Sequence, residues 1–387
     1  MSQGCHEHVR IAIVTESFLP TLNGVTTSVC RVLDCLAAQG GHEVLVVCPG
    51  PAPSNYLGFA VKTVPSVTVR AFRVGLPTKQ LEQILLQFAP DVVHAASPFG
   101  LGARALAAAR NLAIPSVAIY QTDMPSYVAQ HGGVLGDFAH RTSWRWVRHL
   151  HSLADLTLAP SSAATAELAE HGVPRVALWG RGVDTTQFDA TLKTDPQVLA
   201  LRERLAPNGE VIVGYVGRLA PEKELHRLEE IADLPGISIA IVGEGPDRDD
   251  LERLLPNAHF LGRQEGATLA RSYASFDVFV HTGTKETFGQ TLQEAMASGL
   301  PVVAPAAGGP LDIVKPGVTG LLFDPSAPGA LRRSVGSLVA DEAMRERMGG
   351  SAARKVADRS WAGMTDKLLD YYESVIDPEW ARLGEAV

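Results

Sequence analysis

This chain of 387 residues is poor in cysteine, in aromatic side chains and in charge, and it has no long hydrophobic run. Its four cysteines all lie in the first 48 positions and form no CxxC pair. That pattern argues against a disulfide framework or a zinc site and favours a cytoplasmic protein with reduced thiols. No apolar run approaches the ~18 residues that a membrane-spanning helix needs. The first eight residues also lack the basic start and apolar stretch of a secretory signal.

The charge has the wrong sign for a general nucleic-acid-binding protein. Lys and Arg number 34 against 42 Asp and Glu, which makes the formal net charge −8. Affinity for nucleic acid rests on contacts of Lys and Arg with phosphate, so no nucleic-acid partner is expected. What the chain does have is an apolar fraction of 46%, ordinary for a protein with large cores, and a length that favours two domains.

Short β-branched runs alternate with helical patterns along the chain, in two series. The first series predicts strands at 10–15, 43–48, 91–95, 116–120, 156–159 and 175–179. The second predicts strands at 211–216, 237–242, 258–261, 277–281, 301–304 and 320–323. Unbroken apolar strands separated by helices indicate parallel sheets covered on both faces. We therefore predict an α/β protein with two Rossmann-like, doubly wound parallel-sheet domains that face a central cleft.

The rhythm of the two series breaks near residues 182–193, which marks the linker. We expect an N-terminal domain over residues 1–185, joined by a C-terminal helix at about 361–387, and a C-terminal domain over residues 186–360. Open parallel sheets bind ligands beyond the carboxyl ends of their strands, so the residues that follow each strand are the candidates for a site.

Two turns carry residues suited to an anion. After the first strand, Asn23 and Gly24 lead into a helix whose free N–H groups and partial positive charge favour a phosphate. An ordinary turn with an N-cap is the alternative. In the second series, Arg218 and Lys223 straddle a strand-to-helix turn, where a guanidinium fork and a lysine point charge could converge on one diphosphate. Two solvated charges are the alternative there.

The most informative stretch is 281–304. It predicts a strand end, a glycine-containing turn, and a helix with Glu286 at its beginning and Glu294 eight residues further on. Eight residues are about 2.2 turns, or ~12 Å along the axis, so both carboxylates could face one cleft. That separation suits a nucleotide sugar, with one carboxylate binding the sugar hydroxyls and the other the ribose hydroxyls. The alternative is a glutamate favoured by the dipole at the helix start and an unrelated surface glutamate. This alternative does not explain why so apolar a helix carries Gly289 and Thr291 beside the first carboxylate.

At these residues the chain resembles the retaining glycosyltransferases of family 4, which have the GT-B fold. The signature is the pair Glu286 and Glu294, set in E-T-F-G-Q-T-L-Q-E-A-M. Supporting motifs are G-R-L-A-P-E-K (217–223), V-G-E-G-P (242–246), F-L-G (260–262), R-G-V-D (181–184) and N-G-V (23–25). Within the family, Q-T-D (121–123) and residues 148–161 look like the actinobacterial GDP-mannose-dependent α-mannosyltransferases that build glycolipid and lipomannan precursors.

The resemblance implies that the N-terminal domain binds the acceptor and the C-terminal domain binds the nucleotide-sugar donor. It also implies a role for each motif residue. Glu286 would contact the donor sugar and Glu294 would hold the ribose diol. Arg218 and Lys223 would neutralise the diphosphate. The other donor-binding positions implied are Gly24, Gly262, Arg263, Phe288, Gly289 and Thr291. Acceptor contacts are expected from Asn23, Asp123, Arg141 and Arg145.

One position departs from the family pattern. Many relatives have a histidine after the fourth strand, and this chain has Gln121 at that place. Gln121 cannot act as an acid or base, but its amide can bond a sugar hydroxyl, and Asp123 could orient the acceptor. The catalytic candidates are therefore Glu286, Arg218, Lys223, Asp123 and Gln121. His94 also follows a strand and suits a structural role as well as a functional one.

Asp247 and Asp249 match the DxD pattern that holds a divalent metal in a different glycosyltransferase fold. Here they open a helix, where capping and the helix dipole explain them better. No Cys/His ligand spacing is present. We expect no cofactor and no metal ion.

Residues 138–153 predict a basic helix with tryptophans and no acidic residue. One flank carries Arg141, Arg145 and Arg148, and another carries Trp144, Val147 and His151. Such a helix suits an anionic membrane surface, here the inner face of the plasma membrane, or a lipid-acceptor groove. The alternative is a domain helix with tryptophans in the core and solvated arginines.

These features together predict a retaining hexosyltransferase that moves mannose from GDP-mannose to a hydroxyl of a lipid-linked or small-molecule acceptor. Electrostatic stabilisation of the leaving diphosphate would promote donor cleavage. A UDP-sugar-dependent enzyme of the same fold remains open, because backbone contacts can read guanine and uracil alike. A nucleotide-sugar 2-epimerase would need further acid and base groups. A non-catalytic sugar-binding relative is at odds with the intact motif residues.

Overall fold

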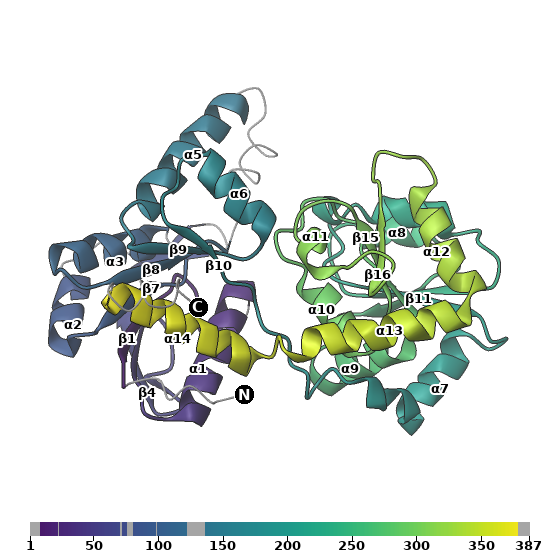
Figure 1. Ribbon diagram of the computed structural model, residues 1–387, viewed down its shortest axis with the longest axis horizontal. Coiled ribbons are helices and arrows are strands. Elements are labelled where there is room, and N and C mark those ends of the chain that lie inside the picture. Colours follow the sequence, from purple (N-terminus) through teal and green to yellow (C-terminus); the bar gives the residue numbers. More distant parts are fainter. Residues whose placement is uncertain are drawn as a thin grey trace, which may run out of the picture. The chain divides into compact units, whose positions relative to one another are not determined.

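The computed structural model describes residues 8–21, 23–69, 72–75, 80–97, 99–121 and 136–377, with the backbone alone at 67–69, 72–74 and 136–141. The chain divides into two compact units, shown in Figure 1. The first unit consists of Met1–Gly180 with Trp361–Val387, and the second is Arg181–Ser360. The division therefore falls at residues 180 and 181, five positions before the expected 185 and 186.

The first unit is built on one large sheet and a small hairpin. The sheet strands are β1 (Arg10–Val14), β2 (Glu43–Pro49), β3 (Asn55–Tyr56), β4 (Phe59–Val64), β7 (Val92–Ala95), β8 (Ser116–Ile119), β9 (Leu156–Ala159) and β10 (Val176–Leu178). They lie in the order β10-β9-β8-β7-β1-β2-β4-β3, parallel except for β3 against β4. The hairpin pairs β5 (Ser66–Val69) with β6 (Phe72–Gly75). All six predicted strands of this series are present, and β3 to β6 were not predicted.

Helices cover both faces of this sheet, as Figure 1 shows. They are α1 (Gly24–Gln39), α2 (Gln80–Phe88), α3 (Gly100–Asn111), α5 (Gly136–His151), α6 (Ser162–Glu170) and α14 (Trp361–Ile376). The last helix joins the core of the first unit, because Trp361, Leu368 and Tyr372 cluster there with β1 and α1 side chains such as Ile11 and Leu33. No helix in the described ranges is both long and apolar enough to cross a membrane.

The second unit has a six-stranded, fully parallel sheet. Its strands are β11 (Val211–Val216), β12 (Ile237–Val242), β13 (His259–Gly262), β14 (Val278–Val280), β15 (Val302–Pro305) and β16 (Gly320–Phe323). They lie in the order β13-β12-β11-β14-β15-β16. The first and fourth strands of the unit are therefore neighbours, with Val213 paired to Val278. Between them the strand order reverses, and this is where open α/β sheets bind ligands.

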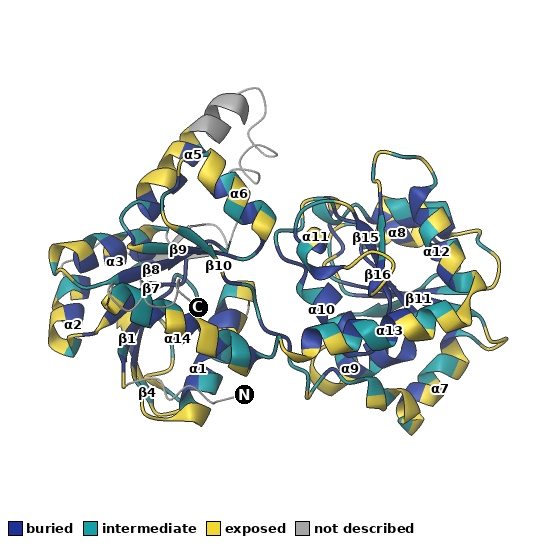
Figure 2. Cartoon of the chain, in the orientation of Figure 1, coloured by how far each residue is buried: buried dark blue, intermediate teal, exposed yellow. Residues whose placement is uncertain are grey.

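Helices and 3-10 turns surround this sheet. They are η2 (Ala190–Thr194), α7 (Pro196–Leu205), η3 (Pro221–Lys223), η4 (Leu225–Ile231), α8 (Arg248–Leu254), α9 (Gly266–Ser275), α10 (Gln290–Ala297), α11 (Pro310–Ile313), α12 (Ala330–Ala340) and α13 (Glu342–Ala357). Alternate residues of β11 enter different apolar clusters: Ile212 joins one face and Val213 the other. Figure 2 shows the strands as the buried layer. A sheet covered on both faces explains the unbroken apolar runs of the sequence.

Glycine lets the carboxyl ends of β11 and β12 touch. Gly217 N donates to Val242 O at 3.0 Å, and a Cβ on Gly243 would lie 1.9 Å from the Gly217 carbonyl oxygen. Gly243 also has a φ of 142°, which a side chain disfavours. The backbones pack so closely beside the turn of Arg218 that the first glycine of the V-G-E-G-P motif, Gly243, is required there.

Candidate functional site

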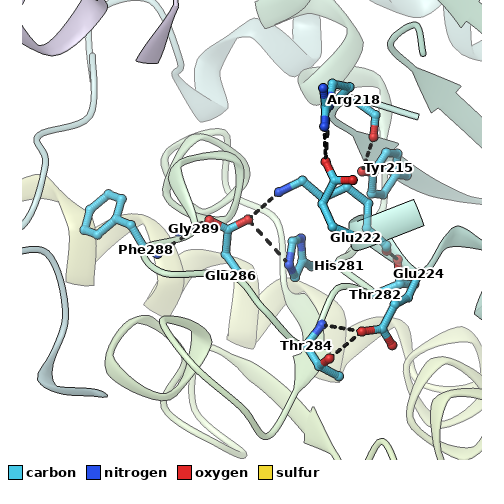
Figure 3. A network of polar contacts seen from close by, with 11 residues as sticks. Tyr215, Arg218, Glu222, Glu224, His281, Thr282, Thr284, Glu286, Phe288 and Gly289 are labelled. Carbon is cyan, nitrogen blue, oxygen red and sulfur yellow. Dashed lines mark hydrogen bonds and ion pairs between the residues drawn. The ribbon is translucent and has the colours of Figure 1, made fainter. Parts of the chain in front are cut away.

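The candidate donor site lies in the second unit, where the strand order reverses between β11 and β14. The loop after β11 carries Arg218 and Lys223, and the loop after β14 runs from His281 to Gly289. Carboxyl ends of parallel neighbours meet at one edge of a sheet. Residues more than 60 positions apart therefore face one another there, as Figure 3 shows.

An ion pair joins the two loops. Lys223 Nζ donates to Glu286 Oε2 at 2.7 Å, and the two side chains are 26% and 17% exposed. His281 Nε2 lies 3.9 Å from the same oxygen. Burial by itself would raise the pKa of Glu286, but Lys223, His281 and the backbone N–H of Phe288 together outweigh it and hold the pKa below its usual value. Glu286 is therefore an anion at neutral pH, held beside a cation.

The expected position of Glu286 in the first turn of a helix is wrong. α10 begins only at Gln290, and Gly289 before it has a φ of 98°, so the chain turns between the carboxylate and the helix. Glu286 Oε1 lies 3.2 Å from Gly289 N and accepts a hydrogen bond from it. The estimate of ~12 Å along one helix axis therefore does not apply to Glu286 and Glu294.

Glu294 lies inside α10 and has different partners. Its Oε2 accepts a hydrogen bond of 2.8 Å from the hydroxyl of Tyr273, a fully buried residue of α9. This hydrogen bond from a buried phenol fixes the orientation of the half-buried carboxylate. Thr291 lies one turn before it on α10 and is half-buried. The sequence pointed to Glu294 but not to Tyr273.

Arg218 and Lys223, which are expected to bind one diphosphate, each form an ion pair with a different carboxylate. Arg218 is 66% exposed and pairs with Glu222 at 2.5 Å, while Lys223 pairs with Glu286. Tyr215 donates a hydrogen bond to the backbone carbonyl of Arg218 at 3.3 Å. Each basic side chain thus has a carboxylate partner that holds it beside the carboxyl end of β11.

The remaining positions of this unit that are expected to bind the donor lie in the loops at the same edge of the sheet. Gly262 ends β13, and its carbonyl accepts from Gly243 N at 2.9 Å. Arg263 is exposed and pairs with Glu265 at 2.5 Å. Phe288 is buried, and its backbone N–H, like that of Gly289, points towards the Glu286 carboxylate.

In the first unit, Asn23 caps α1. Its Oδ1 accepts from Val25 N and Thr26 N, both at 3.0 Å, and Gly24 is the first residue of the helix. The N-cap alternative is therefore sufficient for Asn23. Gln121 Nε2 donates to Ala96 O at 3.1 Å. Asp123 and the side chain of Arg141 lie outside the described residues.

His94 has a structural role. It is buried in the first unit, where its Nδ1 forms a hydrogen bond with the Tyr372 hydroxyl of α14. Burial lowers the pKa of His94 to about 3, so the ring is neutral.

The sequence left two alternatives open for the helix α5, a membrane-facing helix or a domain helix with tryptophans in the core, and the structure has features of both. Trp144 is buried and stacks on His171 with ring centroids 3.7 Å apart, whereas Trp146 is 53% exposed. Arg145 and Arg148 are exposed. One tryptophan is thus core, and the other lies on the surface among cations.

The expected capping role of Asp247 is wrong. Asp247 precedes α8, but its φ of −86° and ψ of 3° depart from the extended conformation of a capping residue, and its side chain caps no N–H. Asp249 does lie in the first turn, where the dipole favours it. Across the described parts of the chain, no three His, Cys, Asp or Glu residues cluster as metal ligands would.

Several residues of the site were not predicted from the sequence. His281 begins the second loop, and burial lowers its pKa to about 4. Glu222 and Glu224 flank Lys223, and Thr284 lies opposite Glu224. The only signal for them was their position within five residues of Lys223 or Glu286.

Two family models match the chain. The model described as Glycosyltransferase Family 4 matches residues 22–187, and the model described as Glycosyl transferases group 1 matches residues 200–355. These ranges correspond closely to the main parts of the two units.

Relatives match over nearly the full length. A GDP-mannose-dependent alpha-mannosyltransferase from Mycolicibacterium smegmatis is 48% identical over 95% of this chain and 98% of that protein. One of the same name from Mycobacterium tuberculosis is 46% identical over 95% of this chain and 97% of that protein. More distant is an alpha-monoglucosyldiacylglycerol synthase from Acholeplasma laidlawii, 28% identical over 76% of this chain and 80% of that protein.

Solved structures show the same fold. Anabaena HepE in complex with UDP superposes with a TM-score of 0.76 over 94% of this chain and 100% of that one, at 20% identity. The expected GT-B fold is confirmed by this likeness and by the two parallel-sheet units.

Proposed function

The chain belongs to the family 4 glycosyltransferases, and from this premise we propose that it transfers mannose from GDP-mannose to a hydroxyl acceptor with retention of configuration. The observation that carries the proposal is the ion pair of Lys223 and Glu286 at the reversal point of the second sheet. The two relatives that share almost half of the sequence are named for this donor and sugar.

The chemistry follows from where charge develops. The bond between the anomeric carbon and the diphosphate oxygen breaks, and the acceptor oxygen bonds to that carbon from the same face. The acceptor proton passes to the leaving phosphate oxygen. Lys223 and Arg218 stabilise the departing diphosphate, which gains negative charge as the bond breaks. Glu286 accepts hydrogen bonds from sugar hydroxyls, and Glu294 accepts them from the ribose.

Binding of GDP to Glu294→Gln tests the donor assignment. An ionised carboxylate contributes ~1.5–3 kcal/mol per hydrogen bond, so losing part of its ribose contact should raise the dissociation constant of GDP about tenfold. Calorimetry should also show that the parent binds GDP more tightly than UDP. Glu342→Gln, an exposed change on α13, is the matched control and should bind like the parent.

The opposite results separate the parts of the proposal. Equal GDP binding by Glu294→Gln would remove the ribose role. Much tighter binding of UDP than of GDP would replace mannose transfer by a UDP-sugar reaction.

We also propose that no metal is needed, because Arg218, Lys223 and the start of α10 supply the positive charge. Turnover should therefore persist in EDTA, and its loss, restored by Mg²⁺, would direct attention to Asp247 and Asp249.

We further propose a lipid acceptor, reached at the inner face of the plasma membrane. Exposed Trp146 lies on α5 next to Arg145 and two residues before Arg148, a combination that favours an anionic lipid surface. The synthase from Acholeplasma laidlawii is named for a diacylglycerol product.

Vesicle flotation tests the membrane contact. The parent should bind anionic phosphatidylglycerol vesicles more than neutral phosphatidylcholine vesicles, and Trp146→Ala should reduce that binding several-fold. Leu86→Ala, which removes an apolar side chain that is 60% exposed on α2, is the matched control. Equal binding by parent and Trp146→Ala would contradict a role for α5.

A further inference from the structure

Glu224, directly after Lys223, has an unusual backbone. Its φ of 49° and ψ of 39° lie in the left-handed region, which residues with a Cβ rarely adopt. Glycine would fit this turn between η3 and η4 without strain. A glutamate at such a position needs contacts that hold it there, and its carboxylate provides them.

The Glu224 carboxylate joins three segments of the second unit. Oε1 accepts hydrogen bonds from Thr284 N at 3.2 Å and from the Thr284 hydroxyl. Oε2 accepts from Arg227 Nε at 2.8 Å, and Arg227 in turn donates to Pro325 O at 2.9 Å. Figure 3 shows the first of these contacts, with Glu224 reaching across to the loop after β14. The carboxylate therefore ties the turn of Lys223 to the loop of Glu286.

Burial and charge fit this role. The Glu224 and Arg227 side chains are only 19% and 21% exposed. Burial alone would raise the pKa of Glu224, but the hydrogen bonds from Thr284 and Arg227 outweigh it and lower the pKa. The carboxylate is therefore ionised at neutral pH, and its hydrogen bonds are charge-assisted.

The same two loops also touch through their backbones. Thr282 Oγ1 donates to the carbonyl of Lys223 at 2.6 Å. A Cβ on Gly283 would lie 3.0 Å from the carbonyl oxygen of Glu222 and 3.3 Å from the Cα of Lys223. The backbone of Lys223 is therefore held on one side by Thr282 and on the other by Glu224, which fixes the point from which its side chain extends to Glu286.

We infer that Glu224 is a positioning residue, which acts through Lys223 by locking the turn after β11 against the loop after β14. This inference rests on the proposed function for its effect on turnover. The carboxylate of Glu224 is engaged by Thr284 and Arg227 and forms no ion pair with Lys223. Its task is to fix the distance between the cation that faces the diphosphate and the carboxylate that faces the sugar.

Glu224→Gly is the sharpest test, because glycine suits the left-handed backbone and the variant should stay folded. We expect its kcat to fall at least tenfold while its melting temperature stays near that of the parent. Leu57→Gly is the matched control, since Leu57 has a φ of 51° and lies exposed in the first unit. Glu229→Ala controls for the loss of one negative charge on η4.

A double variant tells positioning from a general structural effect. If Glu224 acts through Lys223, then Glu224→Gly combined with Lys223→Ala should be no slower, within about twofold, than Lys223→Ala alone. Glu224→Gln, which can still accept from Thr284, should recover part of kcat. Multiplied effects in the double variant, or parent-like kcat in Glu224→Gly, would overturn the inference.

A readout independent of turnover separates this inference from the proposed function. Acylation of lysines by a succinimidyl ester, followed by mass spectrometry, should label Lys223 several-fold faster in Glu224→Gly than in the parent. Exposed Lys62 in the first unit should label equally in both. If the parent failed to turn over GDP-mannose but Lys223 labelling still responded, the mannose proposal would fail and the positioning role would stand. Equal labelling of Lys223 would overturn the positioning role.

Discussion

Lys223→Ala is expected to lower kcat about 100- to 1000-fold while the protein stays folded. Removing one preorganised electrostatic group from a reaction site costs ~2.7–4 kcal/mol in other enzymes, which is this range. Lys223 Nζ lies 2.7 Å from Glu286, and the Lys223 backbone carbonyl accepts a hydrogen bond from Thr282, so the cation is held at the carboxyl end of β11 before a donor binds. The alanine variant loses the cation that acts most strongly as the sugar bond breaks.

GDP release from GDP-mannose would be measured for Lys223→Ala, for Lys223→Arg and for the control Lys285→Ala. Lys285 is exposed on the loop after β14, so its loss should change kcat little. The arginine variant keeps the charge but changes its geometry, and should lie between parent and alanine. Circular dichroism would verify the fold. A kcat of Lys223→Ala within a few-fold of the parent would contradict the diphosphate role.

The sequence was a good guide to the two sheets, for a physical reason. Strands such as β11 and β12 are buried on both faces, so they appear as unbroken apolar runs, and both were predicted over their observed bounds. β3 has only two residues and lies at the edge of the first sheet, and its neighbour β4 has both exposed and buried positions. Such short or half-exposed strands leave too weak a pattern to be predicted.

The site could be predicted only in part. The chain itself indicates that Lys223 and Glu286 each follow a strand, but it does not indicate that β11 and β14 are neighbours. That neighbourhood brings the two residues together across 63 positions. Glu286 is expected at the beginning of a helix because it follows a strand end and a glycine-containing turn, whereas the left-handed turn at Gly289 delays the helix to Gln290.

Glu224 shows what a linear pattern leaves out. Next to a lysine in a turn, a glutamate is indistinguishable from a solvated charge. Its left-handed backbone and its bond to Thr284 exist only in the folded chain. Tyr273 is a similar case, because its hydroxyl meets Glu294 from another helix.

Acid lability is the second large effect that the structure predicts. His94 and His151 are both buried in the first unit, and burial lowers their pKa values to about 3 and about 4. His151 contacts the Thr157 hydroxyl at 3.1 Å and the Tyr120 ring, and His94 contacts Tyr372. These are neutral partners, which give a protonated ring nothing to offset its lost hydration.

The sign of the effect follows from linkage. An unfolded histidine has a pKa near 6.5, so between pH 6.5 and about 4 the unfolded chain binds more protons than the native one. Stability is complete above pH 6.5 and falls as the pH drops through this window. At pH 5 each of the two histidines should cost ~2 kcal/mol relative to pH 7 or above. Glu16, whose pKa is raised by burial, offsets part of this loss.

Urea unfolding of the first unit at pH 7 and at pH 5 would measure the effect. All five tryptophans belong to Met1–Gly180 and Trp361–Val387, so their fluorescence follows this unit alone. We expect the free energy of unfolding to fall by ~3–4 kcal/mol from pH 7 to pH 5. His94→Gln and His151→Gln should each reduce that fall by ~2 kcal/mol, even where they lower stability at both pH values. The exposed change His149→Gln is the control and should leave the fall unchanged. The same pH dependence in all three variants would show that buried neutral imidazoles are not its source.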